Sequence, residues 1–474
     1  MRLLLVMPTG LRVGYDEYFS SSPLGIETLA AHAATVADVA LADLRAKGHD
    51  FEAHAEELLK QDADMIGISL NSATHMNYTK ALAGAIRRRR KDVRIIVGGQ
   101  QATFVADELL GTGDFDAVIR GEGEHVITEI LQRDSFEGVA GISWRSNGSI
   151  HHEADRPLIE DLDSILMPAR HLLKDRSRYR MGEYRIEGIE SSRGCPYQCS
   201  FCSIRNFHRG KWRPKSVDRV MKEVDFILEN YPEEKVIYFA DDNFANDIKR
   251  VEAICRAIVE RKTGAYFWCQ ARADRLAAHP QVVEWMGKAH FAAVLMGIET
   301  PVARLLKSSK KASSVEVVNK AIEMLHSHDI GVWGTFTLGL PGETAQEAKL
   351  TADYIPTANV DVAQITIATP IPGSTLYEEA KADDRLLVTD WDQYDFTSPT
   401  MKGQLPKAEL DKLMHTAYRK VYLSFGFIRA LFTKRTNISR LRRTAFGVFW
   451  AWIWYLIKEQ VLGLIRRKPK DAHP

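Results

Sequence analysis

The amino-acid sequence predicts an α/β protein that has two parallel-sheet units and a helical C-terminal region. Over residues 1–135, short apolar strands alternate with amphipathic helices, a pattern typical of a doubly wound parallel sheet. Between residues 184 and 395, six further strand-and-helix units suit a partial barrel. After about Trp391 this pattern stops, and residues 396–474 are predicted to be helical.

Composition limits the class of protein. The 474 residues, 45% of them hydrophobic, are enough for about two or three domains with cores of their own. A net charge of +1 gives no electrostatic reason to expect nucleic acid as a partner. Five cysteines, three of them in one loop, argue against a secreted disulfide framework and indicate a reducing, cytoplasmic compartment. Met1–Met7 is ended too early by Pro8 for a signal peptide and reads as a buried strand.

Small residues follow the predicted strands of the first unit, where parallel sheets bind their ligands. Ser69 belongs to the strand Met65–Leu70, and Gly98 and Gly99 follow the strand Arg94–Val97. The string Arg120-Gly121-Glu122-Gly123-Glu124 comes later. Because glycine has no side chain, the backbone can approach a bulky ligand closely at these positions.

Residues 136–183 contain Pro157, Pro168 and many polar residues, and they are predicted to be a linker between the two units. The second unit then supplies a series of short apolar segments with helical patterns between them. The predicted strands are Ile186–Glu190, Val236–Ala240, Tyr266–Cys269, Ala293–Gly297, Gly334–Leu338 and Ala363–Ala368.

The first strand of the second unit is followed by a loop that carries three cysteines, Cys195, Cys199 and Cys202. A structural zinc site closes its shell with four donors, whereas a cluster iron that lacks one cysteine keeps an open position. A zinc loop with a distant fourth ligand is the alternative. The spacing, with Phe201 just before the last cysteine, resembles the signature of the radical S-adenosylmethionine (SAM) superfamily. That resemblance implies a 4Fe-4S cluster on the three thiolates, SAM on its open iron, and Phe201 beside the cofactors.

Residues after the next strands also resemble SAM-binding positions of this superfamily. Asp241 and Asp242 are candidates for the SAM amino group, or for a helix N-cap. Arg272 is the candidate for the SAM carboxylate or ribose, with a surface ion pair to Asp274 as the alternative. Glu299 resembles the carboxylate that binds ribose hydroxyls or the amino group.

Further matches strengthen the resemblance along the second unit. The string Gly339–Thr344 resembles a GLPGE turn, and Thr369–Tyr377 resembles the loop beside adenine. Cys269 ends the predicted strand that precedes Arg272, and a thiol at the barrel rim could donate a hydrogen atom to a substrate radical. The alternative is that Cys269, like Cys255, is a packed core residue.

The first unit, placed before such a barrel, resembles the Rossmann-like cobalamin-binding domain of cobalamin-dependent radical SAM enzymes. The resemblance implies that Ser69, Gly98, Gly99, Gly121 and Glu122 contact cobalamin. The sequence contains no Asp-x-His-x-x-Gly string, so cobalt is expected to have no protein imidazole. A degenerate domain that has lost its cofactor is the alternative.

The C-terminal region is strongly basic. Residues 426–474 contain eleven Lys or Arg and two acidic residues, and Thr444–Ile457 is uncharged and rich in aromatic residues. At fourteen residues this segment is too short to span a bilayer, but it fits a helix lying in an anionic membrane surface. The alternative is a helix that packs on the barrel and covers the active site. Either arrangement predicts a small lipophilic substrate, and Tyr418–Phe432 resembles a segment of relatives that act on hopanoids, lipids and tetrapyrroles.

The resemblance implies an enzyme that cleaves SAM reductively and uses methylcobalamin to methylate an unactivated carbon of an isoprenoid, lipid or tetrapyrrole. It also implies an external one-electron reductant of the flavodoxin or ferredoxin type. Two alternatives remain: an oxidative cyclase of the magnesium-protoporphyrin monomethyl ester type, and a non-catalytic cobalamin carrier or sensor. Methylthio transfer to RNA is disfavoured because no cysteine precedes Cys195. The expected location is the cytoplasm, with a peripheral contact to the inner face of the membrane.

Overall fold

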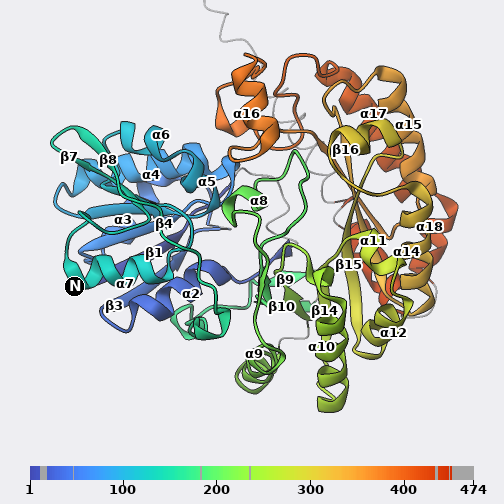
Figure 1. Ribbon diagram of the computed structural model, residues 1–474, viewed down its shortest axis with the longest axis horizontal. Helices are drawn as coiled ribbons and strands as arrows, with labels where there is room; N and C mark the ends of the chain where they lie inside the picture. The colour runs from blue at the N-terminus through green and yellow to red at the C-terminus, as the bar shows by residue number, and fades with distance from the viewer. Residues whose placement is uncertain are drawn as a thin grey trace, which may run out of the picture.

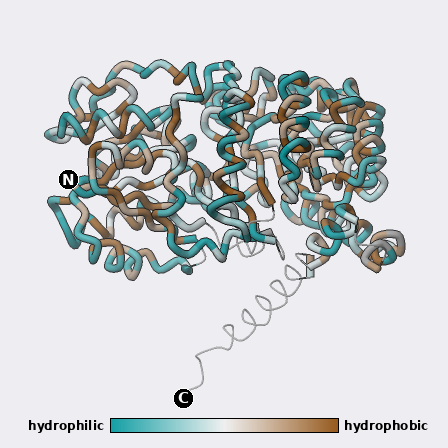
Figure 2. Tube along the Cα trace, turned by 90° about the horizontal axis from the view of Figure 1, so that it is seen from below, coloured by the Kyte–Doolittle hydropathy of each residue, from teal (hydrophilic) through white to brown (hydrophobic). Residues whose placement is uncertain are grey.

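Two sheets organise the chain, one in the blue and cyan lobe of Figure 1 and one in the green to orange lobe beside it. The computed structural model describes residues 1–10, 19–45, 47–181, 184–233, 236–432, 436–447 and 449–450. In Figure 2, hydrophobic segments lie mainly inside the two lobes, as expected where each sheet is covered by helices.

The first sheet is a doubly wound parallel sheet in the strand order β3-β1-β4-β5-β6. Alternate residues of β1 serve its two faces: Leu3 and Leu5 pack toward α2 and α7, while Leu4 and Val6 pack toward α3 and α4. The predicted alternation of strands and helices is confirmed. The strands are β1 (Arg2–Met7), β3 (Asp38–Asp43), β4 (Met65–Ser69), β5 (Arg94–Gly98) and β6 (Ala117–Ile119), and the helices are α2 (Leu24–Ala33), α3 (Phe51–Leu59), α4 (Met76–Arg89), α5 (Gln100–Phe104), α6 (Ala106–Gly111) and α7 (Glu124–Arg133).

The first unit extends beyond the boundary predicted at residue 135. The hairpin of β7 (Ile142–Ser146) and β8 (Ser149–His152) pairs antiparallel with β6, so part of the predicted linker is an edge of this sheet. β8 is largely exposed, and in β7 only Ile142 and Trp144 pack against the core, so no continuous apolar run marked the hairpin. Its sequence signal is the Asn147-Gly148 turn, where φ is 50° and 83°.

The second sheet contains six parallel strands in the order β17-β16-β15-β14-β13-β10, which confirms the predicted partial barrel. The short strands β9 (Arg180–Met181) and β2 (Phe19–Ser20) extend it beyond β10. The parallel strands are β10 (Tyr184–Ile189), β13 (Val236–Phe239), β14 (Tyr266–Gln270), β15 (Phe291–Glu299), β16 (Gly331–Leu338) and β17 (Val362–Ile367).

Helices between these strands bury one face of the barrel sheet. The buried cluster joins Phe239, Phe267 and Phe291 on the strands to Val251 and Cys255 on α10. Burying each of these large apolar side chains contributes about 1.5–3 kcal/mol to folding. The helices are α9 (Val217–Asn230), α10 (Ile248–Arg261), α11 (Ala273–Ala277), α12 (Pro280–Lys288), α14 (Val315–Ser327) and α15 (Ala345–Tyr354).

The described part of the C-terminal region packs on the barrel. The helix α17 (Lys407–Tyr422), the helix α18 (Phe425–Leu431) and a further helix over 437–447 contribute to the barrel core. Arg440 donates to the hydroxyl of Tyr266 at 2.7 Å, and Arg442 pairs with Asp361 at 2.7 Å.

These two contacts lie at the beginnings of the barrel strands. At the opposite end, Gln404 donates to the carbonyl oxygens of Gly339 and Ala368, at 2.8 and 2.7 Å. Most of the predicted membrane segment, Thr444–Ile457, lies outside the described residues. Among the described helices, none combines the length and the apolar character needed to cross a bilayer.

Candidate functional site

A cavity of about 280 Å³ lies between the two units, at the carboxyl ends of their parallel strands. It joins the predicted cobalamin-binding edge to the residues next to the cysteine loop. The first unit contributes Gly25, Gly67, Ser69, Gly98, Gly99, Gly121, Glu122 and Glu124 to its walls, and the second contributes Glu190, Ser192, Arg193, Ile204, Phe207, His208 and Asp242.

Glycines make the first wall of the cavity bare backbone. A Cβ built on Gly25 or Gly121 would meet nothing within 4 Å, so these positions open toward the cavity. A Cβ on Gly99, where φ is +118°, would lie 2.5 Å from the side-chain oxygen of Asn71. Where glycines leave this wall as bare backbone, a large flat ligand such as cobalamin can lie against the peptide groups.

The cysteine loop is closed at its base by a two-stranded antiparallel pair, β11 (Ser192–Arg193) with β12 (Arg213–Pro214). Burial raises the pKa of the Cys195 thiol and raises that of Cys202 to about 12, and the neighbouring cysteines add to both shifts. Buried thiolates that repel one another require a positive centre, and three cysteines on one loop fit the three-thiolate side of a 4Fe-4S cluster. Within the described ranges, no three Cys, His, Asp or Glu side chains have the spacing of an assembled metal site, so the assignment rests on the donor chemistry.

The adjacent carboxylates Asp241 and Asp242 have different roles. Asp241 is fully buried and accepts hydrogen bonds from the backbone and hydroxyl of Ser191, each at 2.7 Å, and from the hydroxyl of Ser192. It was predicted to bind SAM, but its carboxylate is already used to hold the entry to the cysteine loop. Asp242 lines the cavity, accepts from the backbone of Gly194 at 3.0 Å, and has its pKa raised by burial to about 7. Asp242 therefore remains a predicted SAM contact.

Arg272 forms the ion pair that the sequence left as its alternative role. Its guanidinium pairs with Asp274 at 2.9 Å, donates to the carbonyl of Ala312 at 2.9 Å, and stacks 3.7 Å from the ring centroid of Tyr197 in the cysteine loop. These contacts hold the side chain of Arg272 against the cysteine loop, which it supports.

Glu299 lies at the end of β15 in a left-handed conformation, with φ at 66°, which is uncommon for a residue with a side chain. Its carboxylate accepts from the hydroxyl of Thr337 at 2.8 Å and pairs with Lys311, which was not predicted from the sequence. Lys311 follows a short helix and matches none of the strand-end motifs, so the sequence offered no signal for it. Phe201 packs beside the apolar cluster that includes Leu340 of the GLPGE turn.

Cys269 is not at the rim of the site. Its side chain is 1% exposed and belongs to the same buried cluster as Cys255 on α10. Side chains alternate along a strand, and Gln270, the next residue, donates to the hydroxyl of Tyr238. The predicted hydrogen-atom donor is therefore a core residue that faces the helices.

Glu122 lines the cavity, but its carboxylate is directed toward the barrel unit and not toward a ligand of its own domain. It pairs with Arg193 at 3.0 Å and with Arg213 at 2.8 Å, and it accepts from the backbone of Ile159 at 2.7 Å. Burial alone would raise the pKa of Glu122, but the two arginines lower it to about 2. This carboxylate therefore bridges the two units, and the cobalamin contact expected of Glu122 stays a prediction.

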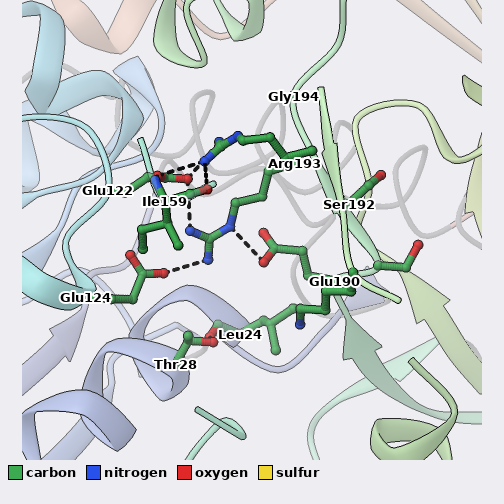
Figure 3. A network of polar contacts seen from close by, with 12 residues as sticks. Leu24, Thr28, Glu122, Glu124, Ile159, Glu190, Ser192, Arg193 and Gly194 are labelled. Carbon is green, nitrogen blue, oxygen red and sulfur yellow. Dashed lines mark hydrogen bonds and ion pairs between the residues drawn. The ribbon is translucent and has the colours of Figure 1, made fainter. Parts of the chain in front are cut away.

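Figure 3 shows the guanidinium of Arg193 between the carboxylates of Glu124 and Glu190 and close to Glu122. Arg193 pairs with Glu124 at 2.6 Å and with Glu190 at 2.8 Å. Sequence reasoning missed Arg193, Arg213 and Glu124, because Glu122 and Arg213 are 91 residues apart and no local pattern connects them.

Comparisons with known proteins agree with this geometry. Residues 189–355 match the Radical SAM superfamily, and residues 17–131 match the B12 binding domain. An uncharacterized methyltransferase of Pyrococcus horikoshii is 30% identical over 89% of this chain and 93% of its own. The hopanoid C-3 methylase of Methylococcus capsulatus is 28% identical over 89% of this chain and 81% of its own. The anaerobic magnesium-protoporphyrin IX monomethyl ester cyclase of Rubrivivax gelatinosus is 25% identical over 92% of this chain and 80% of its own.

Solved structures share the whole arrangement of the two units. The radical SAM methyltransferase TsrM from Kitasatospora setae, with cobalamin and a [4Fe-4S] cluster bound, aligns with a TM-score of 0.72 at 13% identity, covering 95% of this chain and 99% of its own. At that identity the likeness concerns the fold. The sequence matches along both units and the shared fold show that the chain belongs to the cobalamin-dependent radical SAM enzymes, whose cofactors are a 4Fe-4S cluster, SAM and cobalamin.

Proposed function

We propose that this enzyme is a C-methyltransferase that acts on an unactivated carbon of a lipophilic substrate, of the isoprenoid, lipid or tetrapyrrole class. The observation that carries this proposal is a single cavity bounded both by the glycine wall of the cobalamin domain and by residues next to the cysteine loop. When bound, the cluster with SAM supplies hydrogen abstraction and cobalamin supplies a methyl group. A shared cavity brings both to one substrate.

The residues of the chain bind and orient the reactants in this proposal. Cys195, Cys199 and Cys202 would hold the cluster, while Asp242 and the Glu299–Lys311 pair would orient SAM. Ile204 and Phe207 line the cavity on the side of the cysteine loop and would exclude water from it. An external reductant is required, and a flavodoxin or ferredoxin is the proposed donor.

An exposed apolar surface supports the lipophilic substrate and a peripheral membrane contact. Phe425 is 81% exposed and Phe432 is 85% exposed on or next to α18. Exposed basic residues, Arg419, Lys420 and Arg429, accompany them, and each cation near an anionic lipid surface contributes about 1 kcal/mol to binding. Cosedimentation with vesicles containing phosphatidylglycerol should fall in a Phe425→Ser, Phe432→Ser variant. Equal sedimentation would remove the membrane contact without affecting the methylation proposal.

The decisive experiment is anaerobic reconstitution with cobalamin and SAM, followed by incubation with lipid and tetrapyrrole extracts. Methylation should produce 5′-deoxyadenosine and S-adenosylhomocysteine together, because the methyl group comes from a second SAM. A substrate should gain about 14 mass units, because a methyl group replaces a hydrogen atom and the net addition is CH₂. A Cys199→Ala variant should lose its Fe-S absorption and both products.

Oxidative cyclisation is the second candidate, because the magnesium-protoporphyrin cyclase relative matches 92% of this chain. That reaction transfers no methyl group. Formation of 5′-deoxyadenosine without S-adenosylhomocysteine would therefore favour the cyclase. Cobalamin binding that persists without either product, with the cluster intact, would instead favour the carrier or sensor alternative.

A further inference from the structure

We propose that Glu122, a residue of the cobalamin domain, is a positioning residue for the iron–sulfur loop of the other domain. It neutralises two arginines that oppose each other at the base of that loop. This role differs from substrate choice and from methyl transfer, so it does not depend on the proposed function.

The base of the cysteine loop is small. In the pairing of β11 with β12, Ser192 lies opposite Pro214 and Arg193 lies opposite Arg213. Every residue from Gly194 to Trp212 is looped out between them, and all three cluster cysteines lie in that stretch. Because isolated two-stranded pairs are marginally stable, such a base needs support from elsewhere in the molecule.

The cross-strand pair at this base consists of two cations. Like charges directly opposite each other destabilise an antiparallel pair, and here water screens them little. The side chain of Arg193 is 9% exposed and that of Arg213 is 4% exposed. Without a shared counterion, the buried charge of Arg213 would face Arg193 uncompensated, and this repulsion would weaken the pairing of the two strands.

Glu122 is that shared counterion. One of its oxygens, Oε1, accepts from Arg193 at 3.0 Å and from Arg213 at 2.8 Å, and the other, Oε2, accepts from Arg213 at 3.0 Å. Glu124 and Glu190 also pair with Arg193, as Figure 3 shows. Among the carboxylates in the described part of the chain, Glu122 is the partner of Arg213 and thus joins both strands.

The backbone between Arg193 and the first cluster cysteine is short and conformationally restricted. Gly194 separates Arg193 from Cys195, and φ at Gly194 is +88°. A Cβ at Gly194 would lie 2.2 Å from the carbonyl oxygen of Lys211, so the two sides of the loop are in close contact. The backbone of Gly194 is also anchored on Asp242 at 3.0 Å. A shift of Arg193 therefore moves Cys195.

The same segment of the cobalamin domain borders the cavity. Gly121, next to Glu122, opens toward the cavity and donates its backbone N–H to the hydroxyl of Thr103 at 3.0 Å. The structure thus couples the wall of the cobalamin site to the retention of the cluster through one carboxylate, 71 residues before Arg193.

The test is the rate at which iron is lost to a ferrous chelator from anaerobically reconstituted full-length enzyme without added SAM. Glu122→Gln keeps the size of the side chain but removes its charge. We expect at least about tenfold faster iron release, because the substitution leaves the buried guanidinium of Arg213 without its carboxylate partner, directly opposite Arg193. The EPR spectrum of the reduced cluster should broaden, and iron content after gel filtration should fall.

A second variant separates the charge effect from general damage. In Glu122→Gln, Arg213→Gln only Arg193 remains of the opposed cations, so the repulsion is removed and iron release should return toward the wild-type rate. Glu187→Gln is the matched control, since Glu187 is a fully buried carboxylate that pairs with Arg170 at 3.2 Å and with Arg176 at 2.5 Å, away from the loop base. It should lower the unfolding temperature without speeding iron release well below that temperature.

Three outcomes would overturn the proposal. Glu122→Gln could release iron at the wild-type rate, the double variant could release it no more slowly than the single variant, or Glu187→Gln could release it as fast as Glu122→Gln. A failure of methyl transfer would leave all of these iron measurements unchanged, so the two proposals fail separately.

Discussion

Asp241 and Asp242 are neighbours in the chain that both hold the entry to the cysteine loop, but only Asp242 lines the cavity. Asp241 accepts from Ser191 twice, at 2.7 Å each, and Asp242 accepts from Gly194 at 3.0 Å. Because successive side chains point in different directions at a strand end, the carboxylate of Asp241 is buried and that of Asp242 faces the cavity.

Substitution of these two residues should therefore give different defects. Asp241→Asn places an amide against the Ser191 donors, so we expect the free energy of unfolding to fall by about 1–3 kcal/mol. Asp242→Asn should fold with a normal urea midpoint but respond weakly to SAM in the EPR spectrum of its cluster. Equal loss of stability in both variants would contradict the division of roles.

Filling the glycine wall should block cobalamin without unfolding the protein. Gly25 lies on α2 and opens into the cavity, so Gly25→Leu should lower the cobalt content of the purified enzyme at least about tenfold. Gly111 on α6 also has open space around its Cβ position but does not line the cavity, and Gly111→Leu is the matched control. Cobalt content is measured by elemental analysis and stability by circular dichroism. Normal cobalt in Gly25→Leu would place cobalamin elsewhere.

Cys269→Ala should retain full turnover and a full complement of iron. The thiol is packed among apolar side chains, so its removal leaves only a small void and costs about 1 kcal/mol of stability. Product formation per cluster is the measurement, and Cys199→Ala is the inactive reference. A variant that binds both cofactors normally but stalls before product would restore the hydrogen-donor hypothesis.

The GLPGE turn should make stability depend on pH through Glu343. Burial raises the pKa of Glu343 from its usual 4.5 to about 7, so between these values the folded state keeps a proton that the unfolded chain has released. Stability therefore falls as pH rises across this interval, by at most about 1.4 kcal/mol per pH unit for one proton. Glu343→Gln should flatten this loss, as measured by urea unfolding between about pH 5 and about pH 7.

Glu347, in the same turn and helix start, provides the control for that experiment. Its pKa is lowered to about 2 by hydrogen bonds from Arg304 and Thr344, so it is ionised throughout the interval. Glu347→Gln should leave the pH slope unchanged. An identical slope in wild type and Glu343→Gln would show that Glu343 is ionised in the folded protein.

The tail should stabilise the barrel from the end opposite the cavity. Arg442 pairs with Asp361, whose side chain is fully buried and also accepts from the backbone of Val332 at 2.7 Å. Arg442→Gln should lower the free energy of unfolding by about 1–3 kcal/mol while iron and cobalt contents stay normal. Arg429→Gln, at an exposed position, is the control and should leave the free energy of unfolding unchanged. Loss of either cofactor in Arg442→Gln would mean that the tail acts on the site itself.

The sequence by itself determined the two units, the succession of barrel strands along the chain and the cysteine loop. Each of these features has a signal within a short stretch of the sequence. Apolar periodicity marks strands such as Val236–Phe239, and the spacing of Cys195, Cys199 and Cys202 lies within a single turn-rich stretch. The hairpin of β7 and β8 was not predicted, because its strands contain few apolar residues.

Only the tertiary structure decided which charged residues are free to bind a ligand. Asp241, Arg272 and Glu122 have the chemistry of cofactor contacts, and the fold shows that they also bind Ser191, Asp274 and the two arginines of β11 and β12. The strand alternation likewise turned Cys269 toward the core. Ion pairs form between groups that folding brings together from distant parts of the chain, so no local pattern reveals whether a carboxylate remains available.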